Sequence, residues 1–223
     1  MTSSNLDAGF LHGFVESFLV VFVSEFGDNT FFISAILAMK HSRWHVLMGS
    51  LASLFVMNFM SVLVGYAASI IPKVCVTYVS SILFLVFGLK MIQEGWRMSA
   101  DKAEEEYEEA QEHLQKTEAK EKSKATSRNQ TSNMLSQVVI QCFTLTFLAE
   151  WGDRSQVATV ILGAKENILG VLLGSLAGNA LCTCLAVIGG KLIAEKISIR
   201  TVTLVGGVLF LYFAASTFYL DDD

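Results

Sequence analysis

Proline is nearly missing from this 223-residue sequence, which contains it only once, at Pro72. Charged residues are also few, at 17% of the chain, and they are bunched. The scarcity of proline removes the strongest helix breaker and favours long helices. Apolar stretches of 20 residues or more lie between the charges, and a transmembrane helix needs about 20 such residues. With 52% hydrophobic residues and a mean hydropathy of +0.50, the chain is expected to be an all-α, polytopic membrane protein in a lipid bilayer.

Other absences exclude whole classes of function. Basic patches interleaved with aromatic residues are absent, so no nucleic-acid partner is expected, and no Walker-type phosphate loop indicates use of ATP. The segment Met1 to Phe10 has no Lys or Arg and so lacks the basic start of a signal peptide. The four cysteines show no zinc spacing and imply no disulfide framework, so buried thiols are predicted. They are Cys75, Cys142, Cys182 and Cys184.

Six apolar stretches are predicted to cross the membrane as helices. They are residues 12–38, 45–71, 74–95, 134–162, 167–190 and 199–220. The predicted organisation is a first three-helix repeat at 1–99, a charged linker at 100–133 and a second three-helix repeat at 134–223. Sparse apolar residues at helical spacing predict a short surface helix in the linker, which is otherwise interpreted as a solvated tether. They are Ala103, Tyr107, Ala110 and Leu114.

The distribution of Lys and Arg predicts the orientation in the membrane. Cytosolic loops of membrane proteins are enriched in both residues. With six spans, the loops after the first, third and fifth spans share one side, and they hold twelve Lys and Arg. The other side has only Lys73 and Lys165. The linker is therefore expected to be cytosolic, and both termini are expected to face the lumen or the exterior.

The chain repeats itself at an offset of 125 residues. Glu25-Phe26-Gly27-Asp28 aligns with Glu150-Trp151-Gly152-Asp153, and Gly49-Ser50-Leu51-Ala52 aligns with Gly174-Ser175-Leu176-Ala177. One offset that relates motifs in two spans indicates a duplication. Because each copy has three spans, the second copy starts on the opposite side of the membrane, and the repeats are inverted. Secondary transporters have this arrangement, with the site near the membrane midplane between the repeats.

Four carboxylates inside the predicted spans form the candidate site: Glu25, Asp28, Glu150 and Asp153. Within each motif the two acids are three residues apart and share a helix face. An ionised carboxylate at mid-membrane costs about 2.5–3.5 kcal/mol, so the four are expected to face one another, a cavity, protons or a cation. Oxygen ligands suit hard divalent cations such as Ca²⁺, Mn²⁺ and Mg²⁺. Clustered carboxylates cannot all stay ionised in a low dielectric, so protons compete with the ion, which is the physical basis of antiport.

Neutral oxygen atoms near the acids are candidates to complete the cation's shell. On an ideal helix Thr30 and Ser155 lie off the acidic face, but unwinding at Gly27 and Gly152 would change that geometry. Thr146 lies on the face, one turn before Glu150. Arg154 has two interpretations, a structural ion pair with the acids and a gate. The predicted supporting residues are Asn29, Thr30, Thr146, Arg154, Ser155 and Gln156.

Three more polar residues lie in the predicted spans. Glu16 aligns with Gln141 in the repeat and lies on the helix face opposite Glu25, so it is interpreted as a packing or interface residue. Asn58 and Asn179 are interpreted as groups that hydrogen-bond between helices, with a contribution to the ion pathway as the alternative.

The segments 24–32 and 148–156 resemble the paired E-x-G-D-[KR]-[ST] signatures of a Ca²⁺/Mn²⁺:H⁺ antiporter family. The likeness extends over all six spans, and the acidic linker is similar to that of the family's Golgi members, one of which prevents a human glycosylation disorder. The resemblance implies a Golgi membrane protein that moves Mn²⁺ and Ca²⁺ from the cytosol into the lumen in exchange for protons. It implies no cofactor and no enzymatic activity. It assigns the cation and the protons to Glu25, Asp28, Glu150 and Asp153.

One residue departs from the family pattern. Asn29 stands where the family has Lys or Arg, whereas Arg154 retains the positive charge. The two motifs are therefore expected to be alike but not equivalent. A passive divalent-cation channel and an intramembrane hydrolase that uses the carboxylates as acid and base are the alternative functions. The sequence leaves the oligomeric state and the preference between Ca²⁺ and Mn²⁺ open.

Overall fold

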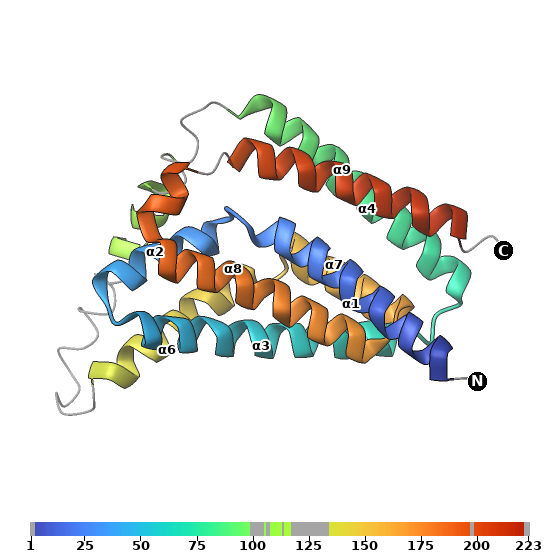
Figure 1. Cartoon of the computed structure of the whole chain (residues 1–223), viewed down its shortest axis with the longest axis horizontal. Coiled ribbons are helices and arrows are strands. Elements are labelled where there is room, and N and C mark those ends of the chain that lie inside the picture. Colours follow the sequence, from blue (N-terminus) through green and yellow to red (C-terminus); the bar gives the residue numbers. More distant parts are fainter. Residues whose placement is uncertain are drawn as a thin grey trace.

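In the computed structural model the chain is a bundle of α-helices (Figure 1). The structure describes residues 3–98, 105, 108–112, 114–116, 134–196 and 199–220. Its main helices are α1 (Ser3–Glu25), α2 (Asn29–Lys40), α3 (Arg43–Ala68), α4 (Lys73–Arg97), α6 (Met134–Glu150), α7 (Arg154–Lys165), α8 (Ile168–Lys196) and α9 (Ile199–Leu220). Pro72 stands at the N-cap of α4, where a proline interrupts no helix.

Two of the six predicted spans are broken rather than continuous. By length and apolarity α3, α4, α8 and α9 can each cross a membrane, and α1 with α2 qualifies as a pair bent by 69°. The apolar helix of residues 138–150 in α6 is shorter, and α7 follows it as α2 follows α1. The prediction of single helices over 12–38 and 134–162 was therefore wrong. In each of these spans the first helix ends at the glutamate of the acidic motif, and a second helix follows.

The outer faces of the long helices are apolar and exposed, as a lipid environment requires. Large hydrophobic side chains on α3, α4 and α9 are each more than two-fifths exposed. They include Phe55, Phe59, Leu63 and Tyr66 on α3, Ile82, Leu85, Val86 and Leu89 on α4, and Val205, Val208, Tyr212 and Phe218 on α9. A water-soluble monomer rarely exposes so continuous an apolar surface, so the protein is a multi-pass membrane protein.

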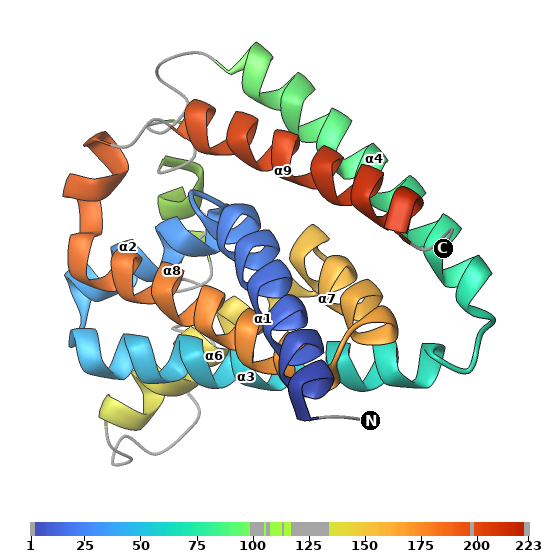
Figure 2. The same ribbon diagram turned by 45° about the vertical axis from the view of Figure 1, so that its right-hand side comes forward.

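The helix boundaries repeat at the same offset of 125 residues as the sequence. α1 and α6 end at Glu25 and Glu150, and α2 and α7 each have 12 residues. The packing follows the same symmetry, because α1 packs on α8 as α6 packs on α3, and α2 packs on α8 as α7 packs on α3. The third helices, α4 and α9, pack antiparallel to each other (Figure 2). The two halves therefore interlock rather than form separate domains.

Glycines allow the paired helices to approach closely. A Cβ atom at Gly49 of α3 would lie 2.6 Å from the carbonyl oxygen of Val139 in α6. In the other half, a Cβ atom at Gly174 of α8 would overlap Ser17 and Phe14 of α1. Gly49 and Gly174 are equivalent positions of the repeat. Small residues with this role are typical of helix packing in membranes.

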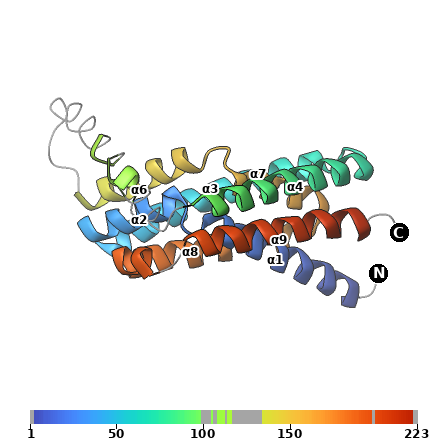
Figure 3. The same ribbon diagram turned by 90° about the horizontal axis from the view of Figure 1, so that it is seen from above.

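The linker contains a helix, as predicted, but it is not only a solvated tether. Residues 105, 108–112 and 114–116 are helical, and Ala110 and Leu114 are fully buried in one core cluster with residues of α2, α6 and α8. The rest of 99–133, including Ala103 and Tyr107, lies outside the described residues. The linker helix lies at the end of the molecule opposite the N- and C-termini, which agrees with an even number of crossings (Figure 1). From above, α4 and α9 are seen to run along the length of the bundle (Figure 3).

Candidate cation site

Each acidic motif forms a break between two helices. The glutamate ends the first helix, and the glycine two residues later has a positive φ, 77° at Gly27 and 79° at Gly152. Glycine adopts this left-handed conformation at little cost, which other residues do not. The aspartate that follows is the N-cap of the next helix, at Asp28 for α2 and Asp153 for α7. The four residues of the motif thus stop one helix and start another.

Three of the four predicted carboxylates converge where the breaks meet. Ligand oxygens of Glu25, Glu150 and Asp153 all lie within 4.8 Å of one another. Glu25 and Glu150 are only 4% and 3% exposed, and one oxygen of each has no hydrogen-bond partner within the described part of the chain. A buried carboxylate oxygen without a partner is costly. The cluster can therefore bind protons or a divalent cation, and its three oxygen ligands suit a hard ion.

Hydroxyl groups reach the cluster from the opposite repeat. Ser155 lies within side-chain hydrogen-bonding reach of Glu25, and Thr30 lies within the same reach of Glu150. On a continuous helix both hydroxyls would lie off the acidic face, so the breaks at Gly27 and Gly152 bring them in. The two contacts are related by the repeat, which is the arrangement that a pseudo-twofold axis between the halves requires.

Two small cavities flank the carboxylates. The cavity beside Glu25 is lined by Thr30, Thr146, Asn179 and Cys182, among others. The one beside Glu150 is lined by Asp153, Ser155, Gln156, Asn58 and Asn179, with Leu54, Met57 and Ser61. Asn179 belongs to both cavities, and its Oδ1 atom has no hydrogen-bond partner among the described residues. Asn58 donates from Nδ2 to Leu54 O over 2.9 Å. The Oδ1 atom of Asn179 is therefore available to an ion beside either glutamate.

Asp153 is both a member of the cluster and a helix cap. Its Oδ1 accepts a hydrogen bond from Gln156 N over 2.9 Å, and its Oδ2 accepts one from Ser155 N over 3.1 Å. Gln156 Oε1 in turn accepts from Gly152 N over 2.6 Å. These bonds hold the carboxylate at the N-terminal end of α7, where the backbone N–H groups of the helix are free to be capped.

Asp28 does not join the cluster. Its side chain makes no cap hydrogen bond, and its Oδ1 lies 3.6 Å from Arg154 Nη2. Arg154 Nη1 also lies 3.6 Å from an oxygen of Glu94 on α4. Asn29, predicted to support the site, is exposed. Arg154 therefore forms an ion-pair bridge from Asp28 to Glu94.

A cavity of about 500 Å³ connects this bridge to both breaks. Its lining includes Gly27 and Asp28, Gly152 to Arg154, and Glu94. It extends to Met98 and Ile199, at the ends of α4 and α9 that lie on the linker side. Asp153 lines both this cavity and the small cavity beside Glu150.

Sequence reasoning missed two residues at the site. Glu94 lies in the third predicted span, but the equivalent position in the second repeat is not acidic, so the repeat did not point to it. Cys182 is buried as predicted, lines the cavity beside Glu25, and donates from Sγ to Phe22 O over 3.4 Å. Burial was correctly predicted for Cys142 and Cys182, but Cys75 is exposed and Cys184 is half-buried. A polar or charged residue inside an apolar span was the available signal for Glu94.

Comparison with known proteins identifies relatives along both repeats. The family model described as "Divalent cation/proton antiporter GDT1" matches residues 13–99 and 138–223. GDT1-like protein sll0615 of Synechocystis sp. is 40% identical over 209 residues, which are 94% of this chain and 98% of that protein. No solved structure gives a significant match.

Two relatives come from Arabidopsis thaliana. GDT1-like protein 3 is 39% identical over 204 residues, covering 91% of this chain and 69% of that protein. Protein PAM71-homolog, chloroplastic, is 41% identical over 223 residues, covering 97% of this chain and 62% of that protein. The family match covers both halves of the chain, including both acidic motifs and the helix breaks that they form. The chain therefore belongs to the GDT1 family of divalent cation/proton antiporters.

Proposed function

We propose that this antiporter exchanges Mn²⁺ or Ca²⁺ for protons at Glu25, Glu150 and Asp153. The observation that carries the proposal is the convergence of these carboxylates from two inverted repeats. Glu25 and Glu150 are buried, and one oxygen of each has no hydrogen-bond partner among the residues that the structure describes. Thr30, Ser155 and Asn179 add neutral oxygens beside them. This donor set suits the two hard ions, whereas a soft ion such as Cu⁺ prefers thiolates.

Competition between the ion and protons supplies the coupling. Without a cation, three carboxylates within 4.8 Å of one another repel, and protons must neutralise part of their charge. A divalent cation that enters displaces those protons, and protons that arrive from the other side displace the cation. The site is then occupied by one cargo or the other, which makes the exchange obligatory.

Asp28 and Glu94 act on the approach to the site rather than in it. Both face the large cavity, and Arg154 neutralises part of their charge. A cation that approaches from the linker side meets these carboxylates before Asp153. Arg154 is thereby a gate, since it competes with the cation for Asp28.

We further infer the direction and the membrane. Both the bias of Lys and Arg and the large cavity are on the linker side, so the cation enters from the cytosol and leaves on the side of the termini. The acidic linker favours the Golgi membrane, where lumenal Mn²⁺ serves glycosyltransferases. The relatives named above are cyanobacterial and plant proteins, one of them chloroplastic. Microscopy of a fluorescently tagged chain, with Golgi and chloroplast markers as appropriate to the host, tests the location.

Flux in proteoliposomes tests the exchange itself. Purified protein is reconstituted, the internal pH is set below the external pH, and uptake of Mn²⁺ and of Ca²⁺ is followed with an internal indicator. We expect the pH gradient to drive uptake against the ion gradient, and collapse of the pH gradient by a protonophore to stop it. Flux that only dissipates the cation gradient would instead identify a passive channel and contradict coupling.

A further inference from the structure

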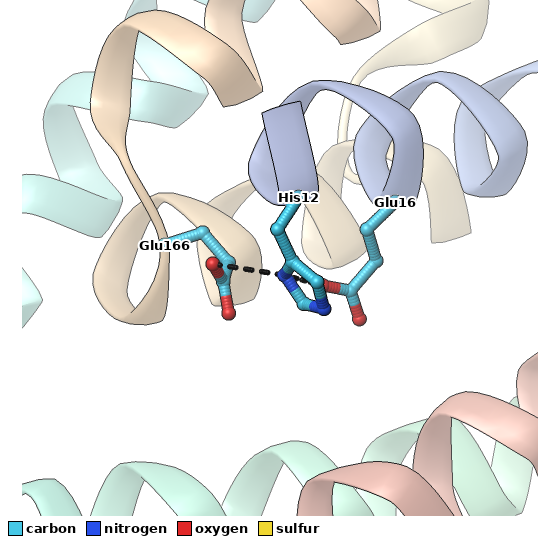
Figure 4. Close-up of side chains that lie close together, drawn as sticks. All are labelled: His12, Glu16 and Glu166. Carbon is cyan, nitrogen blue, oxygen red and sulfur yellow. Dashed lines mark ion pairs between the residues drawn. The ribbon is translucent and has the colours of Figure 1, made fainter. Parts of the chain in front are cut away.

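A second group of metal-ligating side chains lies away from the central cluster. His12 and Glu16 are on α1, and Glu166 is the C-cap of α7 (Figure 4). His12 Nδ1 lies 3.7 Å from Glu16 Oε2 and 3.2 Å from Glu166 Oε2, and the three ligand atoms are all within 4.8 Å of one another. Glu16 precedes Glu25 by nine residues, about 13 Å along the helix, so the two groups are separate.

The fold holds these three side chains together from two repeats. His12 and Glu16 are four residues apart and share one face of α1. Between them Gly13 lets α1 lie against the connection from α7 to α8, because a Cβ atom there would be 3.3 Å from Glu166 Cβ and 3.4 Å from Asn167 N. Glu16, interpreted from the sequence as a packing or interface residue, is buried beside Glu166 of the other repeat.

The backbone on both sides of Glu166 is fixed by hydrogen bonds. Glu166 N donates to Leu162 O over 2.8 Å, at the end of α7. Asn167 Oδ1 accepts from Leu169 N and Gly170 N, each over 3.1 Å, and so caps the start of α8. The carboxylate is therefore presented from a rigid corner rather than from a long flexible loop.

The group places two largely buried carboxylates beside one exposed imidazole. The side chain of Glu16 is 8% exposed and that of Glu166 is 22% exposed, whereas His12 is 60% exposed. Two largely buried carboxylates repel each other, and the partners with positive or titratable charge that act on Glu16 are His12 and Lys165. The His12 contact at 3.7 Å is too long for a hydrogen bond. A divalent ion between the three ligand atoms would neutralise both acids, and the exposed imidazole leaves it a route from solvent.

The donor set differs from that of the central site. One imidazole nitrogen and two carboxylates make a mixed set, which suits first-row transition ions such as Mn²⁺, Fe²⁺ and Zn²⁺. Ca²⁺ and Mg²⁺ prefer shells made only of oxygen. The cluster is therefore expected to discriminate between Mn²⁺ and Ca²⁺ more strongly than Glu25, Glu150 and Asp153 do.

The positions that the 125-residue repeat relates to this group do not carry the same ligands. The positions equivalent to His12, Glu16 and Glu166 are Gln137, Gln141 and His41, which include no carboxylate. His41 is the C-cap of α2 as Glu166 is the C-cap of α7, and its N–H donates to Leu37 O over the same 2.8 Å. The backbone conformation of the C-cap is thus the same in both halves, while the metal-ligating residues are present in one arrangement only among these equivalent positions.

We propose that His12, Glu16 and Glu166 form a second divalent-cation site, selective for first-row transition ions, at the end of the molecule that carries both termini. This site goes beyond the function proposed above and does not depend on it. Its position gives the end of the protein that carries both termini a binding site for the ion.

Binding of Mn²⁺ alone to the full chain in detergent tests the proposal. Electron paramagnetic resonance measures free Mn²⁺ at several total concentrations. The variant Glu25→Gln/Asp153→Asn removes central ligands, and we expect it to retain one Mn²⁺ per chain. Adding His12→Gln and Glu166→Gln is expected to weaken that remaining binding at least about 10-fold. His41→Gln, the matched change at the other end, is expected to leave it unaltered.

Three results would overturn the proposal. They are loss of all Mn²⁺ binding in a folded Glu25→Gln/Asp153→Asn variant, unchanged binding after His12→Gln/Glu166→Gln is added, and equal displacement of the remaining Mn²⁺ by Ca²⁺. Size-exclusion profiles and thermal unfolding establish that each variant is folded, and the near-isosteric Glu16→Gln variant replaces any that is not. A failed flux experiment with intact Mn²⁺ binding would contradict only the transport function proposed for the central site.

Discussion

The two acidic motifs have nearly the same backbone and different side-chain roles. Gly27 and Gly152 have φ values of 77° and 79°, and both aspartates are N-caps with extended backbone. Yet Asp153 caps its helix and joins Glu25 and Glu150, while Asp28 makes no cap hydrogen bond and faces Arg154. The comparison teaches that the duplication preserved the break in each helix but not the distribution of charge around it.

One pair of equivalent positions explains the difference. Arg154 reaches across the interface to Asp28, the cap of the other repeat. Its equivalent, Asn29, has no charge with which to attract Asp153 in the same way. Asp28 therefore pairs with Arg154, and Asp153 is left to complete the carboxylate cluster. A single positive charge, present in one half only, accounts for a cluster of three rather than four.

The largest expected effect comes from neutralising the two aspartates separately. Asp153→Asn removes a cluster ligand and is expected to lower Mn²⁺ flux more than about 100-fold, as is Glu25→Gln, whereas Asp28→Asn is expected to lower it about 10-fold. Initial rates in proteoliposomes under a fixed pH gradient measure the losses. Equal losses at Asp28 and Asp153 would show that the halves contribute alike and would contradict the asymmetric site.

Substitutions that change the charge at positions 29 and 154 are expected to have a smaller effect on transport. Asn29→Arg would place a guanidinium where it can attract Asp153, and it is expected to raise the KM for Mn²⁺ about 5-fold, a change of about 1 kcal/mol. Arg154→Gln frees Asp28 and is expected to shift the KM by a similar factor. Asn29→Gln is the neutral control for the first variant. No change in KM with Asn29→Arg would mean that the missing charge does not determine where Asp153 lies.

Replacing the glycines of the two breaks is expected to lower the stability of the protein to different extents, rather than to change its transport rate differently. Alanine in the left-handed region costs about 1–2 kcal/mol at either position. At Gly27 a Cβ atom would also press on Ile199 at 3.3 Å, whereas at Gly152 nothing lies within 4 Å. Thermal unfolding in detergent should therefore show a larger loss for Gly27→Ala than for Gly152→Ala. The reverse order would mean that the contact with Ile199 is not the deciding difference.

The smallest effects on Mn²⁺ affinity are expected at Thr30 and Ser155, where the two halves are most alike. Thr30→Val and Ser155→Ala each remove one hydroxyl beside a buried glutamate, at a cost of about 0.5–1.5 kcal/mol. Isothermal titration with Mn²⁺ should show similar reductions in affinity for the two variants. Thr30→Ser and Ser155→Thr retain the hydroxyl and serve as controls. A loss confined to one variant would extend the asymmetry from the aspartates to the neutral ligands.

The sequence predicted the inverted repeat and the pairing of Glu25 with Glu150 because a single offset related residues of unlike chemistry. The prediction from the sequence was wrong at the first and fourth spans, because the length of their apolar stretches suggested continuous helices. A local signal was present there: Gly followed by Asp is both a helix stop and a helix start. An ion pair of Arg154 with the motif acids was one of the two predictions for that residue, and the structure pairs it with Asp28. The second partner, Glu94, and the cluster at His12 were not predicted, because both depend on how the two repeats pack against each other.

The interlocking of the halves has a consequence for how such a protein can arise. A half on its own would expose the glycine surface of α3 or α8, which in the whole chain is covered by α6 or α1. It would also hold only part of the ligand set. The ancestral unit could therefore act only as a pair of copies inserted in opposite orientations. Fusion through a linker on one side makes that antiparallel pairing permanent, and it frees each copy to lose or gain charges independently.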